Sequence, residues 1–328
     1  MTPEREIVSP VDLCGADGRL RPDAIGWTRT PLHRANLRGW GRSKRWEYWG
    51  VVTPSHVVGI TIASLDYLGL ASLYVLDRAS GRETERDGVA PFARGIELAD
   101  RAARPARGRA GGVSITLDEE EGGTRITASA EDAEIQIFAE RPIEHEALGV
   151  VVPWSERLFQ YTVKDVARPA RGRIVLEGRA HEVAEGSFAV LDHGRGRWPY
   201  ANTWNWAAGS GARDGRAIGI QLGGKWTDGT GSTENALLAG GRLHKISEDL
   251  TWSYDRTRWT RPWRIHGARV DATLHPFHER CGRVNLIAAS FEAHQCFGHF
   301  EGWATTDAGE TISLDGLVGW AEEAHNRW

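Results

Sequence analysis

Short apolar or alternating runs, each interrupted by glycine, proline or Asp-Gly, make up most of this chain and constrain its fold most strongly. Long stretches with the hydrophobic period of a helix are hard to find. Runs in which apolar and polar side chains alternate, bounded by such turn residues, are typical of antiparallel strands. We therefore expect an all-β protein, with strands at residues 113–117, 125–129, 134–139, 173–177, 217–222, 269–274 and 311–314.

Turn signals separate these runs. The Gly122-Gly123 pair lies between two of them and predicts a hairpin, and Asp228-Gly229 and Gly240-Gly241 predict further turns. In the first half only residues 91–103, which are rich in alanine, are compatible with a helix, and that helix would be short.

The length of 328 residues exceeds what one eight-stranded barrel uses, so we expect two β-barrel-like halves that share an interface. The strand signals pause at residues 168–172, and the part rich in tryptophan begins shortly afterwards. We place the boundary near residue 170. The expected domains are an N-terminal β-barrel-like domain at 1–170 and a C-terminal, Trp-rich one at 171–328.

Charge and hydropathy exclude several classes of protein. A net charge of -4 argues against a general nucleic-acid binder. The charged N-terminus has no apolar segment typical of a secretory signal, and no apolar run reaches the roughly 20 residues of a membrane helix. The three cysteines have no paired spacing, so we expect reduced thiols in a cytoplasmic protein. The oligomeric state stays open.

Residues 191–206, read L-D-H-G-R-G-R-W-P-Y-A-N-T-W-N-W, are the densest group of functional side chains. The chain has 15 tryptophans, and this stretch contains three of them beside an acid, a histidine and two arginines. Desolvating an unpaired charge is costly, so such crowding indicates either a buried polar network or a wall that faces a ligand. We interpret it as the wall of a pocket.

Asp192 is the first candidate for a general acid or base in this segment. In an extended strand, Asp192 lies opposite His193, while Arg195 and Arg197 share a face and could bind a polar head group of the substrate. Burial among indoles would raise the pKa of a carboxyl group and suit it to proton transfer. The alternative is structural, with Asp192 bridging to an arginine or capping a turn before Gly194.

Tyr200, Asn202, Trp204 and Trp206 follow with a period of two, so a strand would place them on one face. Their rings could stabilise a cationic transition state, and a buried amide needs a partner such as a ligand. Alternatively the rings only fill the barrel. We assign all four to substrate binding.

A second period-two face runs from 291 to 303 and includes Gln295, His299, Glu301 and Trp303. Polar groups interleaved with aromatic ones are typical of a lined pocket. We expect His299 and Glu301 to act as an acid–base pair and Gln295 and Trp303 to bind substrate. The alternative is that this face of the strand is turned to solvent.

Glu234 and Asn235, in a T-E-N-A segment, are expected near the same region, with Asn235 as a further substrate-binding residue. The alternative is an Asx-type turn after a glycine-rich segment.

Motifs for organic cofactors are absent from the sequence. There is no G-x-G-x-x-G between a strand and a helix and no Walker loop. The G-x-S-x-G motif of serine hydrolases and the zinc-binding H-E-x-x-H motif are also absent. The 12 histidines are scattered. We therefore expect no cofactor and no metal, although the sequence leaves open a metal site assembled from distant strands.

Several segments resemble the family called domain of unknown function 2804. In the second half the resemblance rests on 191–207, T-E-N-A at 233–236, P-W-R-I at 262–265, Q-x-F-G-x-F-x-G at 295–302 and G-x-x-E-x-x-x-x-x-W at 319–328, and in the first half on W-x-Y-W-G at 46–50. More remotely, the layout is similar to two-domain lipocalin-like proteins, among them carotenoid hydratases, tocopherol cyclases and natural-product cyclases. The resemblance implies two lipocalin-like antiparallel barrel or sandwich halves with few short helices.

The resulting functional hypothesis is a cofactor-independent acid–base enzyme of the lyase or isomerase type. It would be a hydratase, cyclase or isomerase that acts on an apolar, terpenoid- or polyketide-like small molecule, with Asp192 as first and Glu301 as second choice of proton donor. One alternative is a non-catalytic lipid or pigment carrier of the lipocalin type. Another is a carbohydrate-active protein, since tryptophans and paired carboxylates also suit sugars.

Overall fold

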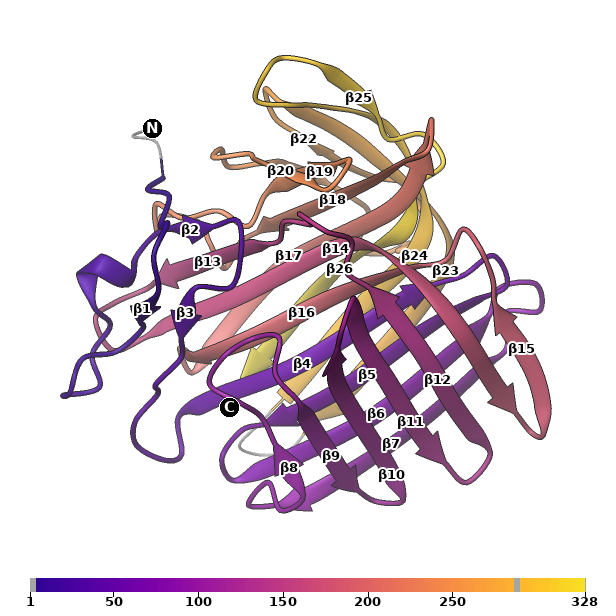
Figure 1. The fold of residues 1–328 in the computed structure, drawn as a ribbon, viewed down its shortest axis with the longest axis horizontal. Helices are drawn as coiled ribbons and strands as arrows, with labels where there is room; N and C mark the ends of the chain where they lie inside the picture. The colour runs from indigo at the N-terminus through magenta and orange to yellow at the C-terminus, as the bar shows by residue number, and fades with distance from the viewer. Residues whose placement is uncertain (1–3, 286–289, 328) are drawn as a thin grey trace.

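Two curled antiparallel sheets make up most of this protein, as a computed structural model that describes residues 4–285 and 290–327 shows (Figure 1). The all-β prediction with two barrel-like halves is confirmed. One 3-10 turn, η1 (Pro22–Ala24), is the helical element of the described part. No helix in that part is long and apolar enough to cross a membrane.

The first sheet has the order β7-β6-β5-β4-β16-β14-β12-β11-β10-β9-β8, with β13, β15 and β2 paired at its side. A short parallel pair, β1 (Val11–Asp12) and β3 (His33–Arg34), lies beside it. The bounds of the sheet are β2 (Trp27–Thr28), β4 (Ser43–Val52), β5 (His56–Ser64), β6 (Leu68–Asp77), β7 (Glu83–Pro91), β8 (Ile96–Glu97), β9 (Ala106–Ala110), β10 (Val113–Glu120), β11 (Gly123–Ala130), β12 (Ala133–Glu140), β13 (Leu148–Pro153), β14 (Phe159–Leu176), β15 (Arg179–Val183) and β16 (Phe188–Arg197).

The second sheet has the order β20-β19-β18-β17-β26-β24-β23-β22-β21, and β25 pairs with β24. Its bounds are β17 (Ala201–Arg213), β18 (Arg216–Gly224), β19 (Ala236–Ala239), β20 (Arg242–Lys245), β21 (Thr251–Ser253), β22 (Trp263–His266), β23 (Val270–Asn285), β24 (Ser290–Thr305), β25 (Thr311–Ser313) and β26 (Val318–Arg327). Each strand expected from the sequence overlaps a strand of one of the two sheets, although residues 177, 269 and 314 lie just outside β14, β23 and β25.

Residues 91–103 do not form the helix that their composition suggested. They form the end of β7, a turn and the short strand β8. Phe92, Ala93 and Gly95 have positive φ angles in this turn, which a right-handed helix cannot contain. The alanine content alone was a weak guide, because tertiary pairing overrides helix propensity.

The chain passes from the first sheet to the second between Arg197, the end of β16, and Ala201, the start of β17. The expected boundary near residue 170 lies inside β14. The pause in the strand pattern at 168–172 has a local cause. β14 changes register against β16 between Asp165 and Arg168, and Ala167 there has a φ of 55°. The Arg-Pro signal therefore marks a β-bulge in a long strand.

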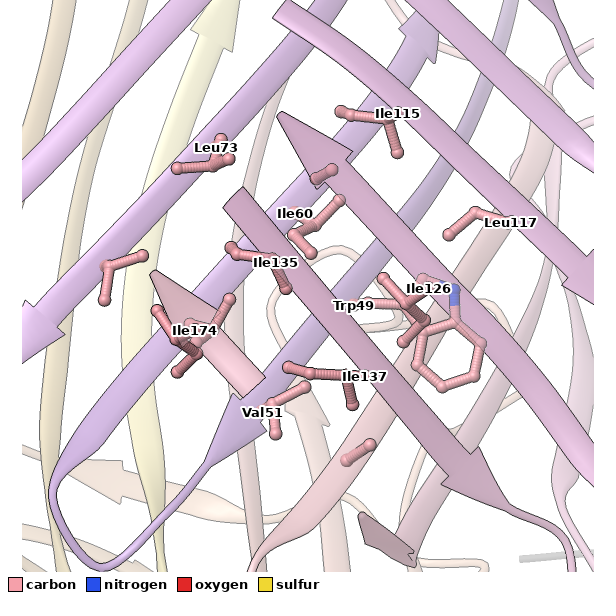
Figure 2. Close-up of a cluster of buried hydrophobic side chains, with 14 of the residues drawn as sticks. Trp49, Val51, Ile60, Leu73, Ile115, Leu117, Ile126, Ile135, Ile137 and Ile174 are labelled. Atoms are coloured by element: carbon pink, nitrogen blue, oxygen red, sulfur yellow. The ribbon is translucent and has the colours of Figure 1, made fainter. Parts of the chain in front are cut away.

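Three large apolar layers stabilise the two sheets, and one of them joins the sheets to each other. The first fills the inside of the first sheet, where Trp49, Ile60, Ile126 and Ile135 meet (Figure 2). The second fills the inside of the second sheet, around Trp263 and other apolar side chains of that sheet. The third lies between the sheets and includes Trp206 and Trp320.

Strands β4 and β16 are consequently buried on both faces. On β16, Ala189 and Leu191 join the layer inside the first sheet, while Phe188 and Val190 join the layer between the sheets. Asp192 continues this second face by the alternation of side chains along a strand. A carboxylate is thereby carried into the interface, where it needs a partner.

Candidate active site between the two sheets

Lys164 on β14 is the centre of a polar cluster in this interface. It lies beside Asp192 in the pairing of β14 with β16, and its Nζ is 3.0 Å from Asp192 Oδ2 and 3.7 Å from Glu234 Oε1. The ammonium also lies over the ring of Trp206, 4.2 Å from its centroid. Thr162 donates to Asp192 Oδ1 at 3.0 Å, so both oxygens of this buried carboxylate are occupied.

Glu234 approaches the cluster from the segment that precedes β19. Its side chain is 1% exposed, and Oε2 accepts the indole N–H of Trp226 at 2.8 Å. Apart from the lysine at 3.7 Å, Oε1 has no hydrogen-bond partner. A fully buried carboxyl oxygen without a donor is unusual and is a place where a proton or a ligand would be stabilised.

Glu322 on β26 is the third carboxyl group of the cluster. Its Oε1 accepts the indole N–H of Trp204 at 2.9 Å, and its Oε2 accepts from Gln295 Nε2 at 3.1 Å. The amide of Gln295 also lies 3.5 Å from the hydroxyl of Tyr48, which comes from β4 of the first sheet. Both sheets thus contribute side chains to one polar network.

The cluster has one ammonium, that of Lys164, beside the carboxyl groups of Asp192, Glu234 and Glu322. The pKa values of Lys164, Glu234 and Glu322 are all raised in this environment. Burial, against the opposing charge of Lys164, raises the pKa of Glu234 to about 7. Burial likewise raises the pKa of Glu322 to about 7, against the indole of Trp204 and the charge of Lys164. For Lys164 burial alone would lower the pKa, but the carboxylates of Asp192 and Glu234 outweigh it and raise the value.

A group of five indoles covers the cluster on one side. Trp198 lies at its middle, with ring centroids 5.5 Å from Trp46, Trp204 and Trp226 and 5.6 Å from Trp154. Trp204 and Trp226 are the two residues that donate to Glu322 and Glu234. Glu234 and Glu322 are therefore hydrogen-bonded directly to two members of this aromatic group.

Two glycines make room for indole rings, one in this group and one in the layer between the sheets. A Cβ atom on Gly194 would lie 2.0 Å from Cε2 of Trp46, and one on Gly50 would lie 2.4 Å from Cη2 of Trp320. Because such distances are far below van der Waals contact, only glycine lets an indole cross the strand at these points.

The other face of β16 carries a second buried network. Glu47 Oε1 accepts from His193 Nδ1 at 2.7 Å and from Arg195 Nη2 at 2.6 Å. Arg195 also donates to the main-chain oxygens of Ala99, Trp46 and Gly194, so its hydrogen bonds are satisfied within the protein. This network ties β4, β16 and the segment after β8 together and has the character of a structural support.

Of the residues that the sequence singled out, the structure brings together in the cluster Asp192, Trp204, Trp206, Glu234 and Gln295. Trp206 has its ring face against the ammonium of Lys164 and donates from Nε1 to Gln221 at 2.7 Å. The extended conformation of β16 does place Asp192 and His193 on opposite faces. Asp192 pairs with a lysine, whereas the structural alternative named an arginine or a turn.

Other predicted residues lie outside the cluster. Arg197 lines a pocket of about 510 Å³ with Trp40 and Arg157, and Asn202 lines another of about 510 Å³ with Lys225 and His325. Tyr200 is 57% exposed. Asn235 is held by the main chain, since it accepts from Gly223 N and donates to Glu248 O.

His299, Glu301 and Trp303 share the face of β24 that carries Gln295 and Phe297, as their period of two predicts. Gln295 and Phe297 are buried, but His299, Glu301 and Trp303 are exposed. The carboxylate of Glu301 is 67% exposed and pairs with His275 at 3.1 Å. β24 extends beyond the part of the interface that the first sheet covers, and these three residues lie on that uncovered part.

Sequence reasoning assigned no role to Lys164, Glu322 or Tyr48, although Glu322 and Tyr48 are fixed positions of the motifs at 319–328 and 46–50. Lys164 lies in an apolar run, Y-T-V-K-D-V, and a lone lysine in a buried strand is a signal that could have identified it. Glu322 and Glu323 lie side by side in W-A-E-E-A, where a strand sends one inward and the other away. The motif at 319–328 specifies the glutamate at 322, but strand alternation alone does not say which of the two lies near Lys164.

Comparison with known proteins agrees with this architecture. The family described as domain of unknown function (DUF2804) matches residues 4–328. No curated protein matches the chain. Among solved structures, kievitone hydratase from Nectria haematococca is 11% identical, with a TM-score of 0.51 over 88% of this chain and 89% of that one. This similarity shows a common fold.

Two further structures align with lower TM-scores. A putative AttH from Nitrosomonas europaea is 16% identical and has a TM-score of 0.49, over 86% of this chain and 92% of its own. CghA is 8% identical, with a TM-score of 0.42 over 92% and 89% of the two chains. The expected resemblance to two-domain lipocalin-like proteins is confirmed at the level of the fold.

Proposed function

Because the chain belongs to the DUF2804 family and shares its fold with a hydratase, we propose that it is an acid–base enzyme acting on an apolar small molecule between the two sheets. The single observation that carries this proposal is the pair of buried carboxyls, Glu234 and Glu322, whose pKa values are raised to about 7. Carboxyls with such pKa values exchange protons near neutral pH, as general acids and bases must.

Glu322 is the proposed proton donor. In its protonated form the O–H is oriented by the surrounding donors Trp204 and Gln295, and the group lies next to the indole surface where an apolar molecule would bind. Transfer of this proton to an alkene carbon uses the π electrons to form the C–H bond, and positive charge develops on the neighbouring carbon. Glu322 is then left as a carboxylate that Lys164 stabilises.

The developing cation would be stabilised by aromatic ring faces and by the carboxylates of the cluster. Trp206 does not have this role in the proposal, because Lys164 already occupies its ring face. Trp204 and Tyr48 are the proposed rings, since both lie next to Glu322 through the hydrogen bonds of the cluster.

Glu234 is the proposed proton acceptor, with its unpartnered Oε1. If water adds to the cation, it gives its proton to Glu234 and the enzyme is a hydratase. If an internal nucleophile adds, the enzyme is a cyclase, and if a neighbouring C–H bond breaks, it is an isomerase. In each case one proton enters the substrate and one leaves it, so the reaction is balanced without a cofactor.

Asp192 has a supporting role in this proposal. Its carboxylate is engaged by Lys164 and Thr162, so it holds the ammonium in place and opposes ionisation of Glu234 and Glu322. Glu301, the second donor suggested by the sequence, is exposed and lies outside the cluster. Since an exposed carboxylate is solvated, the proposal does not use it.

Access for a substrate is proposed through the five-indole group. Trp46, Trp154 and Trp204 are partly exposed, whereas Trp198 and Trp226 are buried. A ligand would displace the partly exposed rings and contact the carboxyls behind them. Binding would therefore change the tryptophan fluorescence of the protein.

The test is proton transfer in D2O. Kievitone and a panel of terpenoid and polyketide-like alkenes are incubated with the full chain, and deuterium incorporation at carbon is measured by mass spectrometry. H2(18)O in a parallel reaction separates a hydratase, whose product gains 18O, from a cyclase or isomerase. We expect turnover that Glu322→Gln lowers by at least about 100-fold.

Glu301→Gln is the matched control, because it removes an exposed carboxylate from the neighbouring strand. It is expected to leave turnover unchanged. A compound that quenches tryptophan fluorescence but gains no deuterium with the wild-type protein would instead support the carrier of apolar ligands. Turnover that survives in both Glu322→Gln and Glu234→Gln would overturn the assignment of the acid.

A further inference from the structure

A second group of side chains that can bind a metal lies on the hairpin of β23 and β24, outside the cluster between the sheets. Cys281 on β23 is directly opposite His294 on β24, and Glu279 is two residues before Cys281 on the same face. One ligand atom from each, Cys281 Sγ, a carboxylate oxygen of Glu279 and a ring nitrogen of His294, lie within 4.8 Å of one another.

This group is separate from the cluster between the sheets. The neighbouring pair, Arg280 and Gln295, is on the opposite face of the hairpin, where Arg280 lies over the ring of Tyr74 and Gln295 donates to Glu322. Glu279, Cys281 and His294 are turned to the inner side of the second sheet, where Cys296 joins its apolar layer. No step of the proposed reaction uses them.

His294 is held in a fixed orientation. Its ring is stacked on Trp259 at 4.0 Å between centroids with an interplanar angle of 11°. Nδ1 is 2.7 Å from Glu279 Oε1, and Nε2 is 3.3 Å from Glu292 Oε1. A carboxylate on the second ring nitrogen is the arrangement that orients histidine ligands in metal sites.

We propose that Glu279, Cys281 and His294 bind a divalent transition-metal ion, with zinc as the best fit. One thiolate, one imidazole and one carboxylate are the donors that zinc takes, and three protein ligands leave the fourth tetrahedral position to water. In this arrangement Nδ1 of His294 binds the ion and Nε2–H donates to Glu292, which acts as a positioning residue.

The spacing of the ligands is compatible with such an ion. Donors bound to one zinc ion at about 2.0–2.3 Å lie about 3.5 Å apart in a tetrahedron. The atoms of this group lie between 2.7 Å and 4.8 Å apart, so side-chain shifts of about 1 Å would be enough. Cys281 is exposed, and the ion can therefore reach the site from solvent.

The test is cobalt binding to the purified full chain, in which Co²⁺ replaces zinc as a spectroscopic probe. We expect visible bands of tetrahedral cobalt, a near-ultraviolet band from thiolate-to-cobalt charge transfer, and loss of both when Zn²⁺ is added. Cys281→Ser is expected to remove the charge-transfer band. Glu292→Gln is expected to keep the band but to weaken the affinity about 10–100-fold.

His275→Ala is the matched control. His275 pairs with Glu301 on the same two strands, 3.1 Å apart, but the exposed pair has no thiol in its contacts. This variant is expected to bind cobalt as the wild type does. Urea unfolding of each variant shows whether the fold is retained. Absence of a charge-transfer band in the wild type, or its persistence in Cys281→Ser, would overturn the proposal.

Discussion

Lys164 and Asp192 form an ion pair of 3.0 Å between neighbouring strands of the first sheet, and the same ammonium lies 4.2 Å from the ring centroid of Trp206 in the second sheet. The pair thus connects the two halves of the protein. It also sets the charge that the other two buried carboxyls experience, since Lys164 and Asp192 both act on Glu234 and Glu322.

Replacing Lys164 with methionine removes the ammonium and leaves Asp192 buried beside two further carboxyls. We expect the free energy of unfolding at pH 8 to fall by about 3–5 kcal/mol, because an uncompensated buried charge is costly. Urea unfolding measures the change. The double variant Lys164→Met/Asp192→Asn should lose less than the sum of the two single variants, and strict additivity would mean that the pair is not coupled.

Glu322→Gln should change how stability depends on pH. In the folded protein the carboxyl of Glu322 keeps its proton up to about pH 7, whereas in the unfolded chain it ionises near its ordinary pKa of about 4.3. The folded state therefore binds more protons between these values, and this group's contribution to stability decreases as the pH rises through the window.

The measurable quantity is the difference in unfolding free energy between the wild type and Glu322→Gln. We expect it to fall by about 2–3 kcal/mol between pH 4.5 and pH 8, with the wild type relatively more stable at the acid end. A difference that is independent of pH over this range would show that Glu322 ionises normally in the folded protein.

Glu47→Gln tests the network on the other face of β16. Burial alone would raise the pKa of Glu47, but the charges of His193 and Arg195 outweigh it and hold the value below its usual range. Its stabilising contribution is therefore present above the ordinary pKa and is lost as the pH falls through the lowered one. We expect a loss of about 3 kcal/mol at pH 7 that shrinks toward pH 3.

Thermal or urea unfolding at a series of pH values checks this expectation. Glu120→Gln is a useful control, because Glu120 pairs with Arg125 at the surface. It should leave the unfolding midpoint unchanged at every pH.

Gly194→Ala tests the close approach of Trp46 to β16. The new methyl group would lie 2.0 Å from Cε2 of the indole, so either the strand or the ring must move. We expect a loss of about 1–3 kcal/mol in unfolding free energy and a change in tryptophan fluorescence. Adding Trp46→Ala should relieve part of the loss, and a double variant as unstable as the sum would argue against this contact.

Much of the fold and part of the site could be predicted from residue patterns. Alternating runs and paired glycines identified strands and turns, because side chains on a strand repeat every second residue. The concentration of charge and indole at 191–206 led to Asp192, Trp204 and Trp206, which do meet at the cluster. The helix at 91–103 was wrong, since alanine content does not reveal the turn at Phe92 and Ala93.

The proposed acid, Glu322, could not be found in the same way. The alternation of side chains along a strand places Gln295, His299 and Glu301 on one face of β24. It does not say how much of that face the first sheet covers, and therefore which of these side chains are buried. Gln295 is covered and Glu301 is not. Glu322 was missed because its environment comes from Trp204, Gln295 and Lys164, all of which are remote in the chain.

The order of residues alone determined that this protein is a two-part β structure, since strand periodicity and turn chemistry are local properties. It also determined that indoles and an acid at 191–206 need partners. The pairing of β17 with β26, and the packing of that sheet on β14 and β16, decided which carboxyls share Lys164. The local pattern determines which side chains share a face of a strand. The burial of those side chains and the charges around them, which set their pKa values, depend on strands that are distant in the sequence.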